Sequence, residues 1–193
     1  MAWDTARTKQ LLLDAAVNEF SEHGLEGARV DRIAKAAGVN KERIYQYFGN
    51  KGQLFATVLQ QELERLAAAV PLALDAEHDL GDYAGRAFDY HCAHPHFARL
   101  LHWEGLQPTG ECAAEATRTA HYAKKIAAVA AAQEAGILSK DVSAADLVRA
   151  VIALSEWSFA TPQLARMTGD ALPDDGVEAR RATVVRAIRK LST

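Results

Sequence analysis

Cationic, amide and phenol side chains, with one carboxylate, are concentrated between residues 29 and 51 of this 193-residue chain. The set comprises Arg29, Lys35, Asn40, Lys41, Glu42, Arg43, Tyr45, Gln46, Tyr47 and Lys51. An arginine guanidinium can donate two parallel hydrogen bonds to guanine O6 and N7, and lysine, asparagine and tyrosine side chains bond to phosphate oxygens. These residue types favour contact with double-stranded DNA, provided that the fold presents them on one surface.

Two short helical segments between residues 30 and 48 would position these side chains. Ala34 is small where the two helices would touch, and Gly38 tolerates the positive φ that a tight turn between them needs. Val39 and Ile44 supply apolar side chains that would anchor the second helix. The spacing of these residues predicts a helix-turn-helix.

The second helix of that pair would cover residues 41–48 and lie in the major groove, with its first residues facing the base edges. Lys41 and Arg43 are the expected donors to bases. Lys51 begins the next helix, where a cation and unpaired backbone amides together suit a phosphate. The alternative for each single residue is an exposed charge that is only solvated.

Helical periodicity extends over the rest of the chain, and no segment alternates apolar and polar residues as a strand would. Asn40, Asn50 and Ser143 are placed as N-caps, and Gly24 and Gly136 as helix stops. Further helices are expected over residues 5–23, 50–71, 79–93, 95–106, 111–135, 144–161 and 176–191, with a helical turn at 162–167 and a loop at 169–176. The predicted fold class is all-α.

Composition excludes several classes of protein. A hydrophobic fraction of 49% without a long apolar run predicts a core but no membrane span, and the first residues lack the apolar stretch of a secretory signal. Cys92 and Cys112 are too few for a disulfide framework and favour a reduced, cytoplasmic protein. The net charge of −3 does not oppose DNA binding, which needs only a basic face. No motif of a common enzyme class is present, so no enzyme activity and no cofactor are expected.

A histidine-rich stretch allows a second chemistry, metal binding. It contains His91, Cys92, His94, His96 and His102. Their spacing beside Pro95 does not give the i, i+4 pair that a site on a helix prefers. The favoured interpretation is a set of ordinary core and surface histidines.

The first part of the chain resembles the DNA-binding region of TetR-type repressors. The matching positions are Leu12–Ala16, Phe20, Gly24, Ile33–Ala34, Ala37–Val39, Tyr45, Phe48, Lys51 and Leu54. The resemblance covers roughly the first quarter of the chain and implies that Tyr45 and Tyr47 contact DNA. Two positions depart from the family pattern. Glu42 is frequently glycine there, and Arg29 is often a Ser or Thr that is expected to cap the preceding helix.

The resemblance also implies a three-helix DNA-binding domain over residues 1–49 and a helical domain for dimerisation and ligand sensing over residues 50–193. In the family, the last two long helices of each subunit form a four-helix dimer bundle. The expected dimer seam comprises Leu147, Val151, Leu154, Val177, Arg181, Val184, Ile188 and Leu191. The seam residues of the last helix have the alternating spacing of four and three residues that is typical of helices packed along a stripe. The alternative is that this stripe packs only within its own subunit.

The family's central helices enclose a mostly apolar effector pocket. The residues expected to line it here are His102, Trp103, Glu104, Tyr122 and Trp157. The alternative is that these aromatic side chains only fill the core.

These inferences combine into one prediction. The chain is expected to be a cytoplasmic homodimer that binds a pseudo-palindromic DNA operator and is released from it by an unknown small-molecule effector. The alternatives are an activator or nucleoid-associated protein of the same fold without a ligand trigger, and, less favoured, a helical enzyme or metal carrier.

Overall fold

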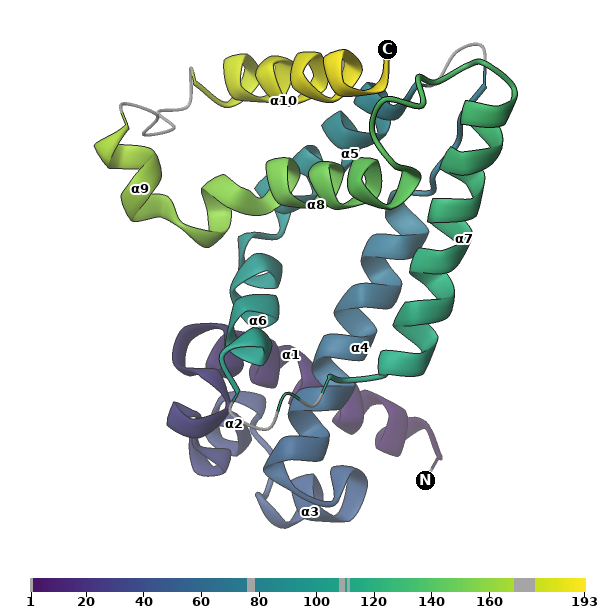
Figure 1. The fold of residues 1–193 in the computed structure, drawn as a ribbon. Coiled ribbons are helices and arrows are strands. Elements are labelled where there is room, and N and C mark those ends of the chain that lie inside the picture. Colours follow the sequence, from purple (N-terminus) through teal and green to yellow (C-terminus); the bar gives the residue numbers. More distant parts are fainter. Residues whose placement is uncertain (1, 76–78, 108–109, 111, 169–175) are drawn as a thin grey trace. The chain divides into compact units, whose positions relative to one another are not determined.

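The computed structural model describes residues 2–75, 79–107, 110, 112–168 and 176–193. Every regular element in these ranges is a helix, which confirms the all-α class (Figure 1). The helices are α1 (Ala2–Gly27), α2 (Val30–Ala37), α3 (Glu42–Phe48), α4 (Lys51–Ala69), α5 (Leu80–Ala93), α6 (Pro95–Gly105), α7 (Glu115–Glu134), α8 (Ala144–Ala160), α9 (Pro162–Met167) and α10 (Gly176–Ser192). None of them, within the described ranges, is long and apolar enough to cross a membrane.

Most helix boundaries fall within a few residues of their expected positions, because local side chains set them. Asn50 Oδ1 accepts a hydrogen bond from the Gln53 amide at 2.8 Å, and Ser143 Oγ accepts one from the Asp146 amide at 3.1 Å. Gly136, just beyond α7, has a φ of 72°. The expected start of α7 at position 111 and residues 169–175 of the expected loop lie outside the described residues.

The chain divides into two compact units. Unit 1 comprises Met1–Arg65 and His96–Ala114, and unit 2 comprises Leu66–Pro95 and Glu115–Thr193. The expected domain boundary between residues 49 and 50 stays a prediction; as a compact unit, unit 1 extends along α4 to Arg65. Most of α4 completes the core of unit 1, where the rings of Phe20 and Phe55 meet edge to face with their centres 5.1 Å apart.

Unit 1 has a core built on the apolar face of α1. Residues at a spacing of four along that helix turn inward together, as the periodicity predicts. The fully buried side chains of the unit are Leu12, Ala16, Phe20, Ile33, Ile44, Leu54, Val58, Leu59, Ala98 and Leu100. The last two come from α6, which joins unit 1 although α5 precedes it in the chain.

A tryptophan docks α6 onto the end of α1. The indole Nε1–H of Trp103 donates a hydrogen bond to the Ser21 carbonyl oxygen at 3.2 Å. Its ring covers Gly24, where a Cβ atom would lie only 2.7 Å from the indole carbons. Gly24 also has φ 65° and ψ −178°, which breaks the helical geometry of α1 there. Only glycine satisfies both the backbone angle and the close approach of the ring.

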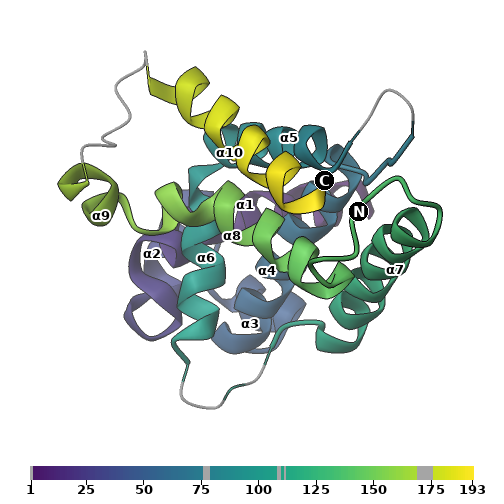
Figure 2. The same ribbon diagram turned by 45° about the horizontal axis from the view of Figure 1, so that its top comes forward.

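Unit 2 is organised around α5, which packs against α8 and α10 (Figures 1 and 2). Gly81 and Gly85 let α10 approach closely, because a Cβ on either would lie 2.9 Å from an atom of Val185. Arg181 Nε donates to the Asp89 carboxylate at 2.8 Å, and Arg189 Nε donates to Asp79 Oδ2 at 2.7 Å. These ion pairs set the register of α10 along α5. Helix α7 packs against α8, which is also a neighbour of α5.

Candidate nucleic-acid interface

The turn between α2 and α3 has the geometry that a helix-turn-helix requires. Gly38 adopts φ 66° and ψ 30°, and the Val39 amide donates to the Ala34 carbonyl oxygen at 3.0 Å. A Cβ on Gly38 would meet no atom within 4 Å, so the position favours glycine for its backbone angle and not for space. Ile33 and Ala34 are buried on the α2 side of the turn. The predicted helix-turn-helix is confirmed.

Helix α3 buries one apolar side chain, and most of its polar side chains are exposed. Ile44 is fully buried and anchors the helix in unit 1. Because α3 is only seven residues long, this one anchor determines which face turns outward. The exposed residues in and next to α3 are Asn40, Lys41, Glu42, Arg43, Tyr45 and Gln46, and Tyr47 is half-buried.

Arg43 is held in place by its neighbours on the same helix. Its Nη1 donates to Gln46 Oε1 at 2.9 Å, and its guanidinium carbon lies 6.0 Å from the centre of the Tyr47 ring. Lys9 of α1 also lies over that ring, with its Nζ at 5.4 Å from the centre. A guanidinium has five donors, so most of them remain for a base or a phosphate. Lys9 was not among the residues predicted from the sequence, because nothing in the local spacing links it to α3.

Lys41 faces solvent in contact with an acidic partner. Its Nζ lies 3.1 Å from Asp31 Oδ1, and both side chains are exposed. The hydrogen bond and the charge of Asp31 raise the pKa of Lys41, so it carries a positive charge. An exposed ion pair is weak and screened by salt. A DNA phosphate or base can therefore replace Asp31 as the partner of Lys41.

Asn40 and Glu42 have roles at the start of α3. Asn40 Oδ1 accepts a hydrogen bond from the Glu42 amide at 3.0 Å, so the expected cap is present and only the Asn40 amide donors remain for DNA. Glu42 lies in the first turn of the helix. A carboxylate there interacts favourably with the helix dipole, which gives this departure from the family pattern a structural reason.

Arg29 stands at the N-cap of α2, the helix that follows it, and not at the end of the preceding helix as expected; its side chain makes no cap hydrogen bond. Glu19 of α1 substitutes for it. Its Oε1 accepts hydrogen bonds from the Arg29 amide and from Arg32 Nε, each at 2.8 Å. The cap thus comes from a different helix, and the exposed guanidinium of Arg29 is not used in it. Lys35, in the last turn of α2, is also exposed.

Lys51 has a structural role that its place in the sequence did not reveal. Its half-buried ammonium donates to the carbonyl oxygens of Glu26 at 3.3 Å and of Ala28 at 3.2 Å. These bonds tie the start of α4 to the end of α1. Because an ammonium has three donors, one is left for a phosphate.

Two family models match the chain. The model described as "Bacterial regulatory proteins, tetR family" matches residues 12–58. The model described as "Tetracyclin repressor-like, C-terminal domain" matches residues 79–190, more than half of the chain. The chain belongs to the TetR family. As a TetR-family protein with an intact helix-turn-helix, it is a DNA-binding regulator of transcription.

Relatives of this TetR-family chain cover nearly its whole length. It is 42% identical over 194 residues to the HTH-type transcriptional repressor SCO4008 of Streptomyces coelicolor, covering 98% of this chain and 97% of that protein. The crystal structure of the transcriptional regulator SCO4942 from Streptomyces coelicolor matches with a TM-score of 0.83 and 35% identity, covering 96% and 98% of the two chains. FadR from Bacillus subtilis in complex with stearoyl-CoA shares the fold, with a TM-score of 0.69, 18% identity and coverage of 93% and 96%.

The side chains expected to line an effector pocket divide between the two units. His102, Trp103 and Glu104 belong to α6 in unit 1, where Trp103 packs on α1 and Glu104 Oε1 accepts a hydrogen bond from the Ala113 amide at 2.7 Å. Tyr122 and Trp157 belong to α7 and α8 in unit 2. The contacts of Trp103 and Glu104 are those of residues that hold α6 in place.

Much of the expected dimer seam is buried within its own unit. Leu147, Val151, Val184 and Ile188 are fully or almost fully buried where α5, α8 and α10 pack together. A side chain that is already buried in this way has no surface to offer to a second copy. These four positions therefore pack within unit 2, and their part in a dimer seam stays a prediction.

The other seam residues have mixed environments. Arg181 is paired with Asp89, and Leu154 and Val177 are half-buried. Leu191 is exposed, as are Ile152 and Trp157 on α8. Exposed apolar side chains of this size are what an interface between copies needs.

The histidine-rich stretch also divides between the units. His91, Cys92 and His94 end α5 in unit 2, whereas His96 and His102 lie on α6 in unit 1. Within the described part of the chain, no three His, Cys, Asp or Glu side chains converge as metal ligands would.

His91 and His96 have separate local partners. The buried ring of His91 stacks on Phe159 with the ring centres 5.9 Å apart. His96 Nε2 lies 2.9 Å from the buried carboxylate of Glu62 on α4. Burial alone would raise the pKa of Glu62, but the hydrogen bond and charge of His96, together with Arg65, lower it.

Proposed function

We propose that this TetR-family regulator is a cytoplasmic repressor that binds a pseudo-palindromic operator as a homodimer and leaves it when a small-molecule effector binds. The observation that carries the proposal is the outward presentation of Arg43 on α3, which follows from the Gly38 turn and the buried Ile44. The name of the relative SCO4008, a transcriptional repressor, supports repression as the mode of action.

Contacts to DNA would divide into base recognition and phosphate binding. Arg43 is the expected base-recognising residue, because its planar guanidinium is already oriented by Gln46 and Tyr47. Lys41, Tyr45 and the remaining donor of Lys51 are suited to phosphates or neighbouring bases. Phosphate contacts orient the protein on the duplex, whereas the Arg43 contact carries sequence information.

Two copies are needed for tight binding, because two half-sites one helical turn apart lie about 34–36 Å from each other. The exposed apolar residues Ile152 and Trp157 of α8 and Leu191 of α10 offer the surface that would join the copies. An effector would act through unit 2. Helix α4 is the natural lever, since it begins in unit 1 and ends in unit 2. A ligand shifts the equilibrium only by its preference for the released conformation.

The test measures binding of the full-length protein to DNA from upstream of its own gene by fluorescence anisotropy. We expect tight binding that weakens steeply with salt. Arg43→Ala should lower the discrimination between the operator and versions with single base changes by roughly 1–3 kcal/mol.

The matched control is Arg166→Ala, which removes another exposed arginine, on α9. It should leave both affinity and discrimination unchanged. If Arg43→Ala binds every operator version as the unmodified protein does, α3 does not recognise bases through Arg43. Absence of any salt-sensitive binding to the upstream DNA would refute the proposed function itself.

A further inference from the structure

Unit 2 contains a group of cationic side chains on α5 and α7. Lys125 of α7 and Arg86 of α5 both lie near the ring of Tyr83, at 5.3 Å and 5.9 Å from its centre, with Lys125 at the hydroxyl end of the ring. Lys125 Nζ also donates a hydrogen bond to the Tyr83 hydroxyl oxygen at 2.6 Å. Tyr83 is buried and Lys125 is partly buried, so this charge is not simply that of a solvated surface.

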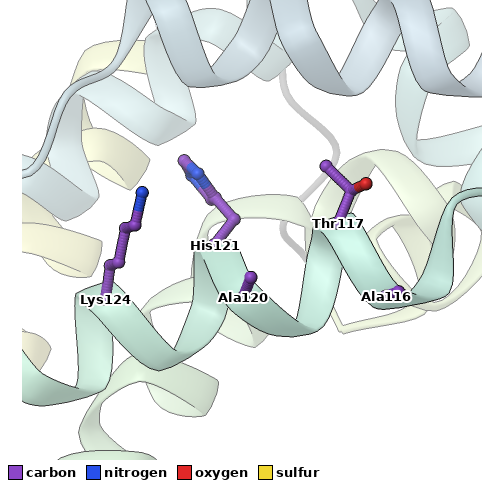
Figure 3. Close-up of a pocket in the computed structure, with 5 residues that line it drawn as sticks. All are labelled: Ala116, Thr117, Ala120, His121 and Lys124. Carbon is purple, nitrogen blue, oxygen red and sulfur yellow. The ribbon is translucent and has the colours of Figure 1, made fainter.

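A hollow with a volume of about 460 Å³ runs along the same stretch of α7. The residues lining it are Ala116, Thr117, Ala120, His121 and Lys124. Figure 3 shows Thr117, His121 and Lys124 projecting to one side of the helix, as their spacing requires. Lys125 follows His121 by four residues and therefore lies one turn further along the same face. The hollow combines an apolar floor of alanines with a hydroxyl, an imidazole and an ammonium.

Among the described residues, the acidic side chains balance Arg86 of this group but not the two lysines of α7. Asp82 is bonded to Arg86 at 3.0 Å, and in the described ranges no carboxylate pairs with the ammonium of Lys124 or Lys125. His121 Nε2 is buried without a hydrogen-bond partner among those residues. Burial of a polar or charged group costs free energy unless a partner compensates for it.

The pKa values of Lys125 and His121 are both shifted towards the uncharged form. Burial lowers the pKa of Lys125. Burial, followed by the charges of Lys125 and Lys124, lowers the pKa of His121. A nearby negative charge would act in the opposite direction on both groups.

We propose that the hollow along α7 binds a small organic carboxylate, with its carboxyl group near His121 and the ammonium groups of Lys124 and Lys125 and its apolar part along the alanines. A carboxylate accepts charge-assisted hydrogen bonds from an ammonium and an imidazole together. A cationic ligand would be repelled, and a neutral one would leave the charges uncompensated. The volume falls within the range of small-molecule sites, about 300–1,000 Å³.

The proposal identifies the effector of the regulator as a carboxylate, and it therefore rests on the proposed function. Its occupation would attach a ligand to unit 2, the unit assigned above to effector sensing. The carboxylate supplies the counter-charge that the described residues do not provide for Lys124 and Lys125.

The test uses three molecules with one skeleton and different charge: 4-phenylbutyrate, 4-phenylbutanamide and 4-phenylbutylamine. The full-length protein carries ¹³C-labelled histidine, and His121→Gln identifies the His121 signal. We expect 4-phenylbutyrate at millimolar concentration to shift this signal in a saturable way and to raise the pKa of His121. The amide and the amine should do neither. Equal binding of carboxylate and amide, or no saturable shift with the carboxylate, would overturn the proposal.

Charge-removing variants test the ammonium groups directly. The double variant Lys124→Met with Lys125→Met keeps the length of both side chains and should weaken 4-phenylbutyrate binding at least tenfold. Lys125→Arg, which keeps the charge, should retain binding and shows that a change at this position is tolerated. The matched control is Lys140→Met, which removes an exposed ammonium paired with Glu134. Unchanged affinity in the double variant would refute the roles of Lys124 and Lys125.

Operator binding is measured separately, so the two proposals can fail independently. Loss of operator affinity on addition of 4-phenylbutyrate supports both. Saturable carboxylate binding without any effect on operator affinity supports the site and refutes its role in release. Operator binding by a protein that does not bind the carboxylate refutes the site alone.

Discussion

At the scale of single residues, the one buried side chain of α3 determines which of its residues are exposed to solvent. Ile44 turns inward, and Arg43 and Tyr45 on either side of it therefore turn outward. Their residue types and their helix could be predicted from local spacing. The partners of Lys51 and the approach of Lys9 to Tyr47 could not, because both contacts join segments that are distant in the sequence.

A buried histidine in unit 2 gives the protein a defined response to acid. Burial, with the charge of His94, lowers the pKa of His91 from 6.5 to about 4. Below pH 6.5 the unfolded chain binds a proton that the folded chain does not, so folding stability falls as the pH drops towards 4. The contribution of His91 to this loss is on the order of 3 kcal/mol.

The variant His91→Phe should show a flatter dependence of the free energy of unfolding on pH between 6.5 and 4. Urea-induced unfolding followed by circular dichroism measures it at several pH values. His102→Phe, at an exposed histidine, is the control and should keep the slope of the unmodified protein. An unchanged slope in His91→Phe would show that another group is responsible for acid sensitivity.

At the scale of elements, helix lengths and caps could be predicted well, whereas the placement of α6 could not. Its periodicity predicts a helix after Pro95, but not that this helix packs in unit 1 with α1. That placement depends on the fit of the Trp103 ring over Gly24 and on the hydrogen bond from the indole to Ser21. The same fit explains why Trp103, a reasonable pocket residue by composition, holds two helices together.

Gly24→Ala should destabilise unit 1, because alanine cannot adopt φ 65° with ψ −178° without strain and its Cβ would overlap the indole. The expected loss is at least about 2 kcal/mol in the free energy of unfolding. Faster hydrogen exchange at the Trp103 indole N–H, observed by NMR, would accompany it.

The neighbouring glycine of α1 provides a control for that substitution. A Cβ atom on Gly27 would lie 3.4 Å from the Cβ of His23, which is an ordinary van der Waals distance. Gly27→Ala should therefore be neutral or slightly stabilising. Equal stability of the Gly24→Ala and Gly27→Ala proteins would contradict the role assigned to the contact between Trp103 and Gly24.

At the scale of the whole molecule, two compact units share the helix α4, and a stripe of apolar residues on α8 and α10 lies inside one of them. An a/d spacing shows that a helix face is apolar but not which neighbour covers it. The interface between copies must therefore be sought among the side chains that remain exposed. Ile152 and Trp157 of α8 are 38% and 45% exposed.

Ile152→Glu should weaken self-association at least tenfold, because a carboxylate placed in an apolar interface is desolvated without a partner. Sedimentation equilibrium over a range of protein concentrations measures the dimer dissociation constant. Ile137→Glu, at an isoleucine that is 61% exposed beyond the end of α7, should have no effect. A dimer that is equally stable in both variants would exclude this face of α8 as the interface.

The sequence by itself determined the helical class, the positions of nearly all the helices and the turn that makes α2 and α3 a helix-turn-helix. These features depend on hydrogen bonds and steric limits among residues a few positions apart, so periodicity, caps and Gly38 were sufficient. Only the tertiary structure decided that Val184 and Ile188 of α10 are buried within unit 2, and that Trp103 of α6 packs on α1. It also decided that Lys124, Lys125 and His121 have no acidic partner among the described residues. Those facts depend on which distant segments pack together, and spacing along one helix carries no information about its neighbour.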